Sequence, residues 1–235
     1  MRALAAASLF LLAVSTSEGR AYARADREVV VDDFESYEEG AAPNAWRFFT
    51  RRDRAFLPLE EFMAANERFY VVRDGGNSFL RGYTRAEAQR ISLGNGQGDF
   101  HWSLKTHPKL SWQWRALKLP KGAREDKLND SGAAIYVTFD KKDWLGRPHS
   151  IKYTYSSTLP RGTEVDSGNV KVIVVSSGAD GTGRWVTVER NVAADYRRLF
   201  GQAPPDRPFS ITLWSDSDDT RGEAEADFDN IRLLP

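Results

Sequence analysis

The sequence predicts an all-β fold, a jelly-roll β-sandwich of roughly twelve strands with one or two short helices. Three observations lead to this prediction. Short runs rich in β-branched and aromatic residues recur along the chain, separated by clusters of Gly, Pro, Asn and Asp. Apolar and polar residues alternate within the longer runs, as in strands that bury one side. The first and last runs, Val-Val-Val-Asp-Asp-Phe-Glu at 29–35 and Ala-Asp-Phe-Asp-Asn-Ile-Arg-Leu at 226–233, are alike, and we expect them to pair side by side.

Each run between two turn signals is predicted as one strand. The strands are expected at 29–34, 45–50, 68–73, 78–84, 89–93, 110–119, 133–140, 150–156, 170–176, 184–190, 209–215 and 225–233. A short helix is expected at 57–67. A second helix is expected at 192–200, where Asn191 can cap the N-terminus and Gly201 ends the helix.

The start of the chain has the pattern of a secretory signal peptide. Arg2 precedes an apolar stretch from Ala3 to Val14 that is too short to span a bilayer. Ala21-Tyr22-Ala23 and Ala23-Arg24-Ala25 both offer cleavage sites. We therefore expect a signal peptide at 1–23 and a single β-sandwich domain at 24–235, which is periplasmic or secreted. No later apolar run is long enough to cross a membrane, so no membrane insertion is expected.

The composition excludes several classes of function. Basic and acidic residues balance at 33 each, whereas a general nucleic-acid binder needs a basic surplus, so no nucleic-acid partner is expected. The chain has no cysteine, so a calcium site would have to provide the cross-linking that disulfides provide in other exported domains. There is no Gly-x-Ser-x-Gly, phosphate-loop or His-Glu-x-x-His motif, which argues against serine hydrolase, nucleotide-dependent and zinc-protease chemistry.

Alternation separates the polar side of four strands from the side that faces the core. If these strands share one sheet, their polar sides form one surface that carries aromatic rings and cations. Flat rings suit the apolar faces of pyranose sugars, and cations suit hydroxyls and carboxylates. An ordinary solvated outer face is the alternative. The residues expected to bind a ligand on this surface are Gln113, Arg115, Tyr136, Lys152 and Trp214.

Acidic residues suggest structural calcium at two places. The turn at 216–222 follows the early spacing of a calcium loop, although Arg221 replaces the glycine that an EF-hand requires. The paired terminal strands are the second place, because they would bring several carboxylates together. Turn hydrogen bonds at the first place, and an arginine or backbone donor at the second, are the alternatives. The expected metal ligands are Asp33, Glu35, Asp229, Asp216 and Asp218.

Several stretches in the second half of the chain are distinctive. They include Leu-Ser-Trp-Gln-Trp-Arg at 110–115, Asn-Asp-Ser-Gly-Ala-Ala-Ile-Tyr-Val-Thr-Phe at 129–139 and Asp-Tyr-Arg-Arg-Leu-Phe-Gly at 195–201. In these stretches the sequence resembles a bacterial family known as domain of unknown function 3047, and the segment at 32–35 fits as the opening of that family. This resemblance implies no particular activity. More distantly, the two ends resemble galactose-binding-like carbohydrate-binding modules, which implies a jelly roll, glycan binding and calcium bridging the termini.

The leading hypothesis is an exported, non-catalytic protein of the bacterial cell envelope whose partner is a polysaccharide or other glycan. One alternative is a polysaccharide lyase or glycosidase acting on the same polar face, for which Arg115, Lys152, Tyr136 and His149 are suitable residue types. His149 taken alone reads as an ordinary surface residue at a loop edge. The other alternative is a structural or assembly protein that binds another envelope protein through a sheet edge.

Overall fold

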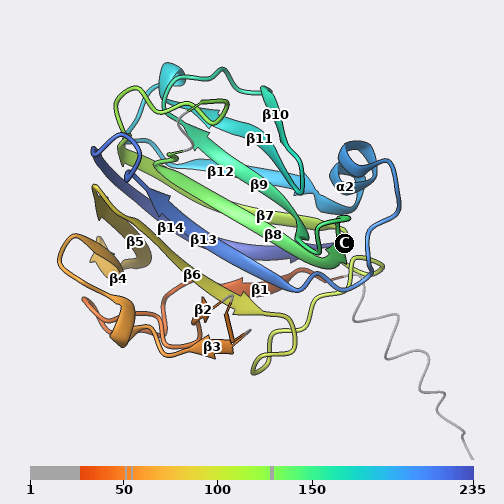
Figure 1. Cartoon of the computed structure of the whole chain (residues 1–235). Coiled ribbons are helices and arrows are strands. Elements are labelled where there is room, and N and C mark those ends of the chain that lie inside the picture. The colour runs from red at the N-terminus through yellow and green to blue at the C-terminus, as the bar shows by residue number, and fades with distance from the viewer. Residues whose placement is uncertain (1–26, 51, 54, 128–129) are drawn as a thin grey trace, which may run out of the picture.

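Strands dominate the computed structural model, which describes residues 27–50, 52–53, 55–127 and 130–235. Fourteen strands in these residues form two large sheets and one small one (Figure 1). The jelly-roll β-sandwich expected from the sequence is confirmed. The expected signal peptide at 1–23 lies outside the described residues.

Each of the two large sheets contains six strands. Sheet A has the spatial order β12 (Val186–Asn191), β7 (Lys109–Lys118), β14 (Glu223–Leu234), β5 (Asn77–Arg85) and β4 (Glu67–Asp74), with β1 (Val29–Asp32) also paired to β14. Sheet B has the order β10 (Glu164–Ser167), β11 (Val170–Ser177), β9 (Pro148–Ser156), β8 (Ala133–Lys142), β13 (Ser210–Asp216) and β6 (Ala88–Gly94). The small sheet is the hairpin of β2 (Phe48–Thr50) and β3 (Ala55–Leu57), which lies near β6.

The first and last strands lie side by side, as the sequence predicts. β1 is antiparallel to β14, with Val29 opposite Leu233 and Val30 opposite Arg232. The chain passes from sheet A to sheet B between β7 and β8, and it changes sheet again at each step from β11 to β14. Strands that are consecutive in sequence therefore often lie in opposite sheets, as is typical of a jelly roll.

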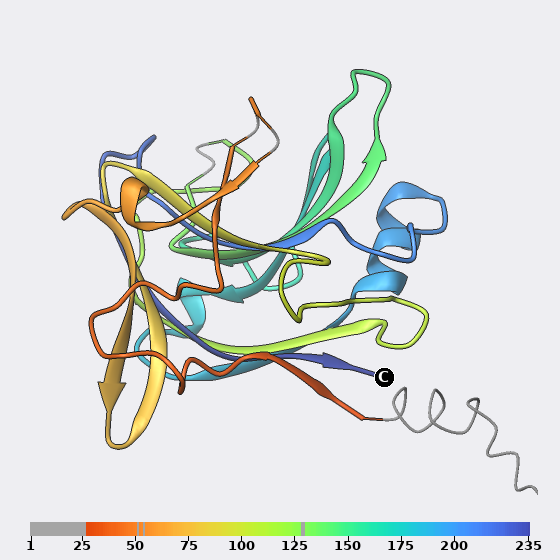
Figure 2. The ribbon, with the colours of Figure 1, turned by 90° about the horizontal axis from the view of Figure 1, so that it is seen from below.

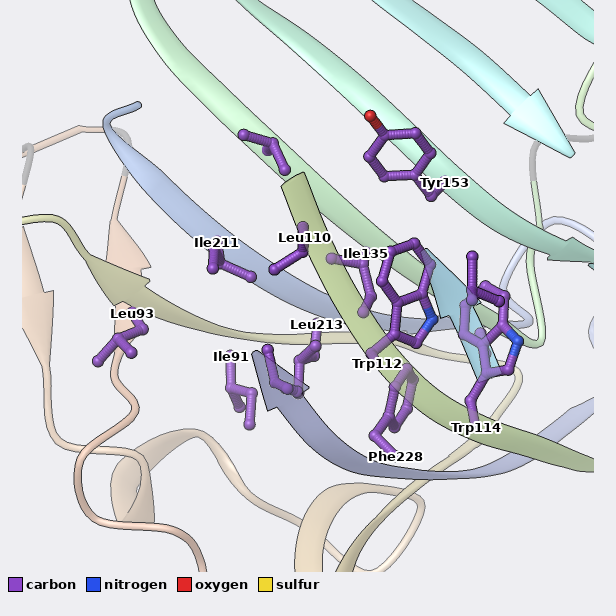
Figure 3. Packing of buried hydrophobic residues seen from close by; sticks show 14 of the residues in the cluster. Ile91, Leu93, Leu110, Trp112, Trp114, Ile135, Tyr153, Ile211, Leu213 and Phe228 are labelled. Atoms are coloured by element: carbon purple, nitrogen blue, oxygen red, sulfur yellow. The ribbon is translucent and has the colours of Figure 1, made fainter. Parts of the chain in front are cut away.

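The hydrophobic core lies between the sheets and uses the buried sides that alternation predicts. Trp112 and Trp114 on β7 point inward, and Tyr153 and Ile135 of sheet B lie close by (Figure 3). The two indole rings meet edge to face with centroids 5.4 Å apart, and the Trp112 ring lies 5.6 Å from the Tyr153 ring. All four side chains are fully buried. Because the interior is close-packed, these contacts couple the two sheets.

The only α-helix of the described residues, α2 (Val192–Phe200), covers one end of the sandwich and has the predicted bounds (Figure 1). Asn191 caps it by accepting the Ala194 amide at 2.8 Å, and Gly201 ends it at a φ of 65°. The buried carboxylate of Asp195 accepts a hydrogen bond from the Tyr153 hydroxyl at 3.0 Å, which ties the helix to the core. No helix of the described residues is long and apolar enough to cross a membrane.

The helix expected at 57–67 is wrong. β3 ends at Leu57, one 3-10 turn covers Glu60–Phe62, and β4 begins at Glu67. Leu59 is buried in the main core, whereas Phe62 stacks on Phe48 of the small hairpin with centroids 4.0 Å apart. These two packing contacts keep the segment in an irregular conformation. Tertiary packing here outweighs a weak local preference for helix.

Candidate functional site

The five residues expected to bind a ligand lie on two different sheets. Gln113 and Arg115 are on β7 in sheet A, whereas Tyr136, Lys152 and Trp214 are on β8, β9 and β13 in sheet B. The expectation that all five share one face is therefore wrong. Alternation identifies the outer side of each strand, but it carries no information about which sheet the strand joins.

On sheet A, Arg115 neutralises a buried carboxylate. Its Nε donates to Asp227 Oδ2 at 2.7 Å, and Arg81 donates to both oxygens of the same carboxylate at 2.6 and 3.0 Å. The Arg115 guanidinium also lies 4.8 Å from the Trp185 ring and 5.0 Å from the Phe79 ring. The charge and position of Arg115 are thus accounted for by contacts within sheet A.

Gln113 on the same face is also engaged at both ends of its amide. Its Nε2 donates to Thr187 Oγ1 at 3.3 Å, and its Oε1 accepts from Asn230 Nδ2 at 3.2 Å. These bonds link β7 to its two neighbours in sheet A, β12 and β14. They give Gln113 a role in joining strands.

Rings and cations alternate across the outer face of sheet B. The Tyr136 and Trp214 rings have centroids 5.2 Å apart, and Lys152 Nζ lies 5.6 Å from the Tyr136 ring. On the other side of Trp214, the Arg90 guanidinium lies 5.0 Å from the Trp214 ring and 5.1 Å from the Phe48 ring. We call this row the ladder: Phe62, Phe48, Arg90, Trp214, Tyr136 and Lys152.

Strand register builds the centre of the ladder. Arg90 on β6 is directly opposite Trp214 on β13, and Tyr136 on β8 is directly opposite Lys152 on β9. Arg90, Trp214 and Tyr136 are half-buried, whereas Lys152 is fully buried. A ligand on this face would therefore meet the two rings first, and Lys152 supports Tyr136 from within.

The loop between β7 and β8 covers one end of this face. Glu125 of the loop is buried and accepts hydrogen bonds from Thr154 at 2.8 Å and Ser156 at 2.6 Å, both on the outer side of β9. The part of the face that stays accessible is thus centred on Tyr136 and Trp214.

Two buried polar atoms of β13 have no hydrogen-bond partner: Trp214 Nε1 and Asp216 Oδ1. These residues are two positions apart, so both project from the outer side of the strand. Burial raises the pKa of Asp216 to about 7, opposed by the positive charge of Lys152, while the carboxylates of Asp130 and Asp218 add to the rise. Unpaired buried groups cost free energy, and because both atoms are closed to solvent, neither is open to a ligand that lies on this face.

An aromatic cluster that was not expected from the sequence lies beside the ladder. The rings of Phe49 and Phe56 in hairpin β2–β3 lie 5.4 and 5.8 Å from the Phe209 ring, and all three residues are half-buried. Figure 2 shows this hairpin on the outer side of sheet B, the side towards which the tip of hairpin β8–β9 also extends. The sequence signal for this cluster was the pair Phe48-Phe49. A strand of three residues is too short for alternation to show which of its side chains face the core.

The three terminal acids expected to bind calcium come near one another at the paired ends. Burial raises the pKa of Asp229, and the charges of Glu35 and Asp33 add to the rise. Glu35 Oε1 accepts the Ser78 amide at 2.9 Å, and Asp229 Oδ2 accepts Asn77 Nδ2 at 3.0 Å. No lysine or arginine among the described residues forms an ion pair with any of the three acids. Oxygen donors without a cationic partner suit a hard cation such as Ca²⁺, but the oxygens of these three acids are not all within 4.8 Å of one another, as those of Asp130, Asp218 and Asp219 are.

The backbone beside these acids is unusual in both terminal segments. Phe34 and Asn230 have positive φ values of 57° and 49°, which non-glycine residues rarely adopt. The adjacent carboxylate of Asp32 fixes the first segment by accepting hydrogen bonds from Trp46 Nε1 at 2.8 Å and the Tyr37 hydroxyl at 2.9 Å. The three terminal acids are therefore presented by a well-held backbone.

A second acidic cluster forms around the turn after β13. One ligand atom from each of Asp130, Asp218 and Asp219 lies within 4.8 Å of the others, and neither Asp130 nor Asp219 was among the metal ligands expected from the sequence. The Asp130 carboxylate accepts the backbone amides of Asp219 at 3.1 Å and Thr220 at 2.8 Å. A hydrogen bond between Asp216 and Asp218 adds to the rise in the pKa of Asp216. Hydrogen bonds to Asp130, which lies outside the turn, thus stabilise it, whereas the alternative expected from the sequence was bonds from the turn's own Asp side chains.

His149 is buried under the helix, so the expectation of an ordinary surface residue is wrong. Its ring stacks on Phe200 of α2 with centroids 4.2 Å apart, and its Nδ1 lies 2.8 Å from the Tyr196 hydroxyl. Burial lowers the pKa of His149. Its position identifies it as a packing residue for α2.

The family described as "Protein of unknown function (DUF3047)" matches residues 59–232. The chain belongs to this family. The match extends much further towards the N-terminus than the motifs in the second half of the chain indicated. It does not include the segment at 32–35, which we expected as the opening of the family. A comparison with curated proteins found no match.

Solved structures with a related arrangement include both binding modules and an enzyme. One is the family 11 carbohydrate-binding module of the Clostridium thermocellum cellulase Lic26A-Cel5E, with 13% identity, a TM-score of 0.43 and coverage of 88% of this chain and 94% of that one. Another is the catalytic domain of Humicola grisea Cel12A, with 11% identity, a TM-score of 0.38 and coverage of 88% and 97%. Likenesses this weak say nothing about what this chain binds.

Proposed function

We propose that this chain is an exported, non-catalytic protein of the bacterial cell envelope that binds a polysaccharide or other glycan on the outer face of sheet B. The observation that carries the proposal is the ladder, in which Trp214 and Tyr136 stand side by side and half-buried between two cations. Aromatic rings in a row suit the apolar faces of successive sugar rings.

Two features support binding without turnover in the envelope. Hydrolysis by paired carboxylates needs one acid on each side of the bond. The acids nearest the ladder, Asp216, Asp218 and Asp130, instead interact with one another in one cluster. Export to the periplasm or beyond follows from the signal-peptide pattern of residues 1–23.

The first experiment is an array of neutral and acidic polysaccharides probed with residues 24–235 in calcium-containing buffer. The best ligand is then titrated against the native protein and the variants Trp214→Ala and Tyr136→Ala. Each variant should bind more weakly by about 1–3 kcal/mol if its ring stacks on a sugar. Trp185→Ala is the matched control, because this half-exposed tryptophan lies beside β12, on the opposite sheet.

The outcomes separate the three hypotheses. An unchanged affinity and melting temperature in Trp214→Ala would remove Trp214 from the site. New reducing ends or unsaturated products after prolonged incubation would identify a glycosidase or polysaccharide lyase. A blank array together with co-purification of another envelope protein would favour the structural or assembly role.

We also propose that Ca²⁺ holds the paired ends of the chain through Asp33, Glu35 and Asp229. The proposal rests on three carboxylates near one another without a described cationic partner. The turn after β13 is the second proposed place: oxygens of Asp218, Asp130 and Asp219 lie within 4.8 Å of one another there, and Asp216 lies beside them.

Calcium binding is tested by melting temperature in calcium and in a chelator. Calcium should raise the melting temperature of the native protein, because it binds only the folded state. Asp229→Asn should reduce the shift if the ends bind the ion, and Asp218→Asn should reduce it if the turn does. Asp74→Asn is the control, since Asp74 is an exposed acid in β4. A shift that survives both site variants would exclude both places.

A further inference from the structure

A hollow of about 340 Å³ opens at the edge of the sandwich, where β11 of sheet B and β12 of sheet A begin to separate. Its wall includes Tyr155 and Val175, which belong to the core between the sheets, and Val186, where β12 begins. The hollow is thus separate from the ladder, which lies on the outer side of sheet B. Its volume falls within the usual range of about 300–1,000 Å³ for small-molecule sites.

The rim of the hollow is held in place by hydrogen bonds. The Tyr155 hydroxyl donates to the Gly181 carbonyl at 2.7 Å, and Arg184 Nη2 donates to the Asp180 carbonyl at 2.9 Å. Ser177 Oγ accepts the Ala179 amide at 3.2 Å, at the start of this segment. The hollow is therefore preformed, which lowers the cost of ordering it around a ligand.

Three charged side chains line the hollow: Arg161, Arg184 and Asp180. Arg161 forms no hydrogen bond or ion pair with any described residue, and the bond that Arg184 makes is to a backbone carbonyl. Asp180 forms no ion pair with either arginine. The hollow therefore has two guanidinium groups against one carboxylate, and its excess charge is positive.

The hollow also offers a hydroxyl donor. Ser176 lines it, and its Oγ accepts a hydrogen bond from Trp114 Nε1 at 3.0 Å, so the Ser176 proton is left to be donated elsewhere. Together, the wall supplies two guanidinium forks for an oxyanion, a hydroxyl donor, and a carboxylate that can accept from a ligand hydroxyl.

We propose that this hollow binds an acidic sugar unit, in which one ring carries a carboxylate or phosphate oxyanion. Arg161 and Arg184 bind the oxyanion, and Asp180 accepts a hydrogen bond from a ring hydroxyl. The volume has room for one ring rather than for a chain. The ligand is therefore a free sugar acid, or a terminal or branching unit of a polymer. This site does not depend on glycan binding at the ladder.

Titration calorimetry with glucuronate, glucose 1-phosphate, glucose and inorganic phosphate tests the proposal and separates the two oxyanions. We expect at least one of the two sugar acids to bind, and glucose to bind far more weakly. Arg161→Gln and Arg184→Gln should each weaken that binding about tenfold or more, as loss of a charge-assisted hydrogen bond does. Arg207→Gln is the matched control, because this exposed arginine lies away from the hollow.

Melting temperatures verify that each variant is folded. The proposal is overturned if neither sugar acid binds the native protein, or if binding is unchanged in the double variant of Arg161 and Arg184. Inorganic phosphate binding as tightly as the sugar acids would also overturn it, because the ring would then contribute nothing. Trp214→Ala should leave this binding unchanged, which keeps the test distinct from that of the ladder.

Discussion

Replacing Asp227 by Asn would leave two guanidinium groups facing each other on the outer face of sheet A. The Asp227 side chain is 0% exposed, whereas those of Arg81 and Arg115 are 19% and 18% exposed. The native carboxylate accepts three hydrogen bonds of 2.6 to 3.0 Å from the two arginines. An Asn side chain accepts at one oxygen only, and its NH₂ group would point at an arginine donor.

The expected loss follows from these contacts. Removing one partner of a buried ion pair costs about 3–5 kcal/mol. Because both arginines reach solvent, water screens part of their repulsion, and we expect a loss of about 2–4 kcal/mol in the free energy of unfolding. That is a large share of the roughly 5–15 kcal/mol that stabilises a typical domain.

Urea denaturation followed by tryptophan fluorescence measures this loss. Glu223→Gln is the control, because Glu223 pairs with Arg85 and Lys118, which are 64% and 48% exposed. Such an exposed network is screened by water and should contribute little to the free energy of unfolding. If Asp227→Asn destabilises the protein no more than Glu223→Gln, the reasoning from burial is refuted.

Two further predictions concern the core and the helix. Trp112→Phe should destabilise the protein less than Trp114→Phe, by about 1 kcal/mol in urea unfolding, because the buried Trp112 Nε1 has no partner while Trp114 Nε1 donates to Ser176. Equal losses would contradict this. Burial lowers the pKa of His149 from 6.5, so the unfolded chain binds more protons and the folded protein should lose stability as pH falls below 6.5. His149→Phe should flatten that part of the melting-temperature profile between about pH 5 and 7.5, and an unchanged slope would argue against it.

Local patterns in the sequence predict much of this fold. Alternation placed Trp112 and Trp114 inside, and the signals at Asn191 and Gly201 predicted both ends of α2. The helix predicted at 57–67 did not form, because Leu59 packs in the main core and Phe62 packs on the small hairpin, and these contacts determine the path of the segment. β3 and β10 were not predicted, because strands of three and four residues are too short to show a periodic pattern.

The candidate site was predictable only where it depended on single strands. Tyr136 and Trp214 were identified because each stands on the polar side of a clearly alternating strand. Arg90 and Phe48 were missed, since they join the ladder through strand register and through a hairpin docked beside β6. Gln113 and Arg115 were correctly placed on the outer side of β7 but grouped with residues of the other sheet, because sheet membership is decided by long-range pairing.

Both outer faces combine rings and cations, and what separates them is how completely their polar groups are paired. On sheet A, Asp227 is bound by two arginines, and Trp185 lies against one of them. On sheet B, Trp214 Nε1 and Asp216 Oδ1 are buried without partners, and the pKa of Asp216 rises to about 7. Unpaired buried groups cost free energy, so the outer face of sheet B gives up stability at these two atoms, whereas the outer face of sheet A retains it through the three hydrogen bonds of Asp227.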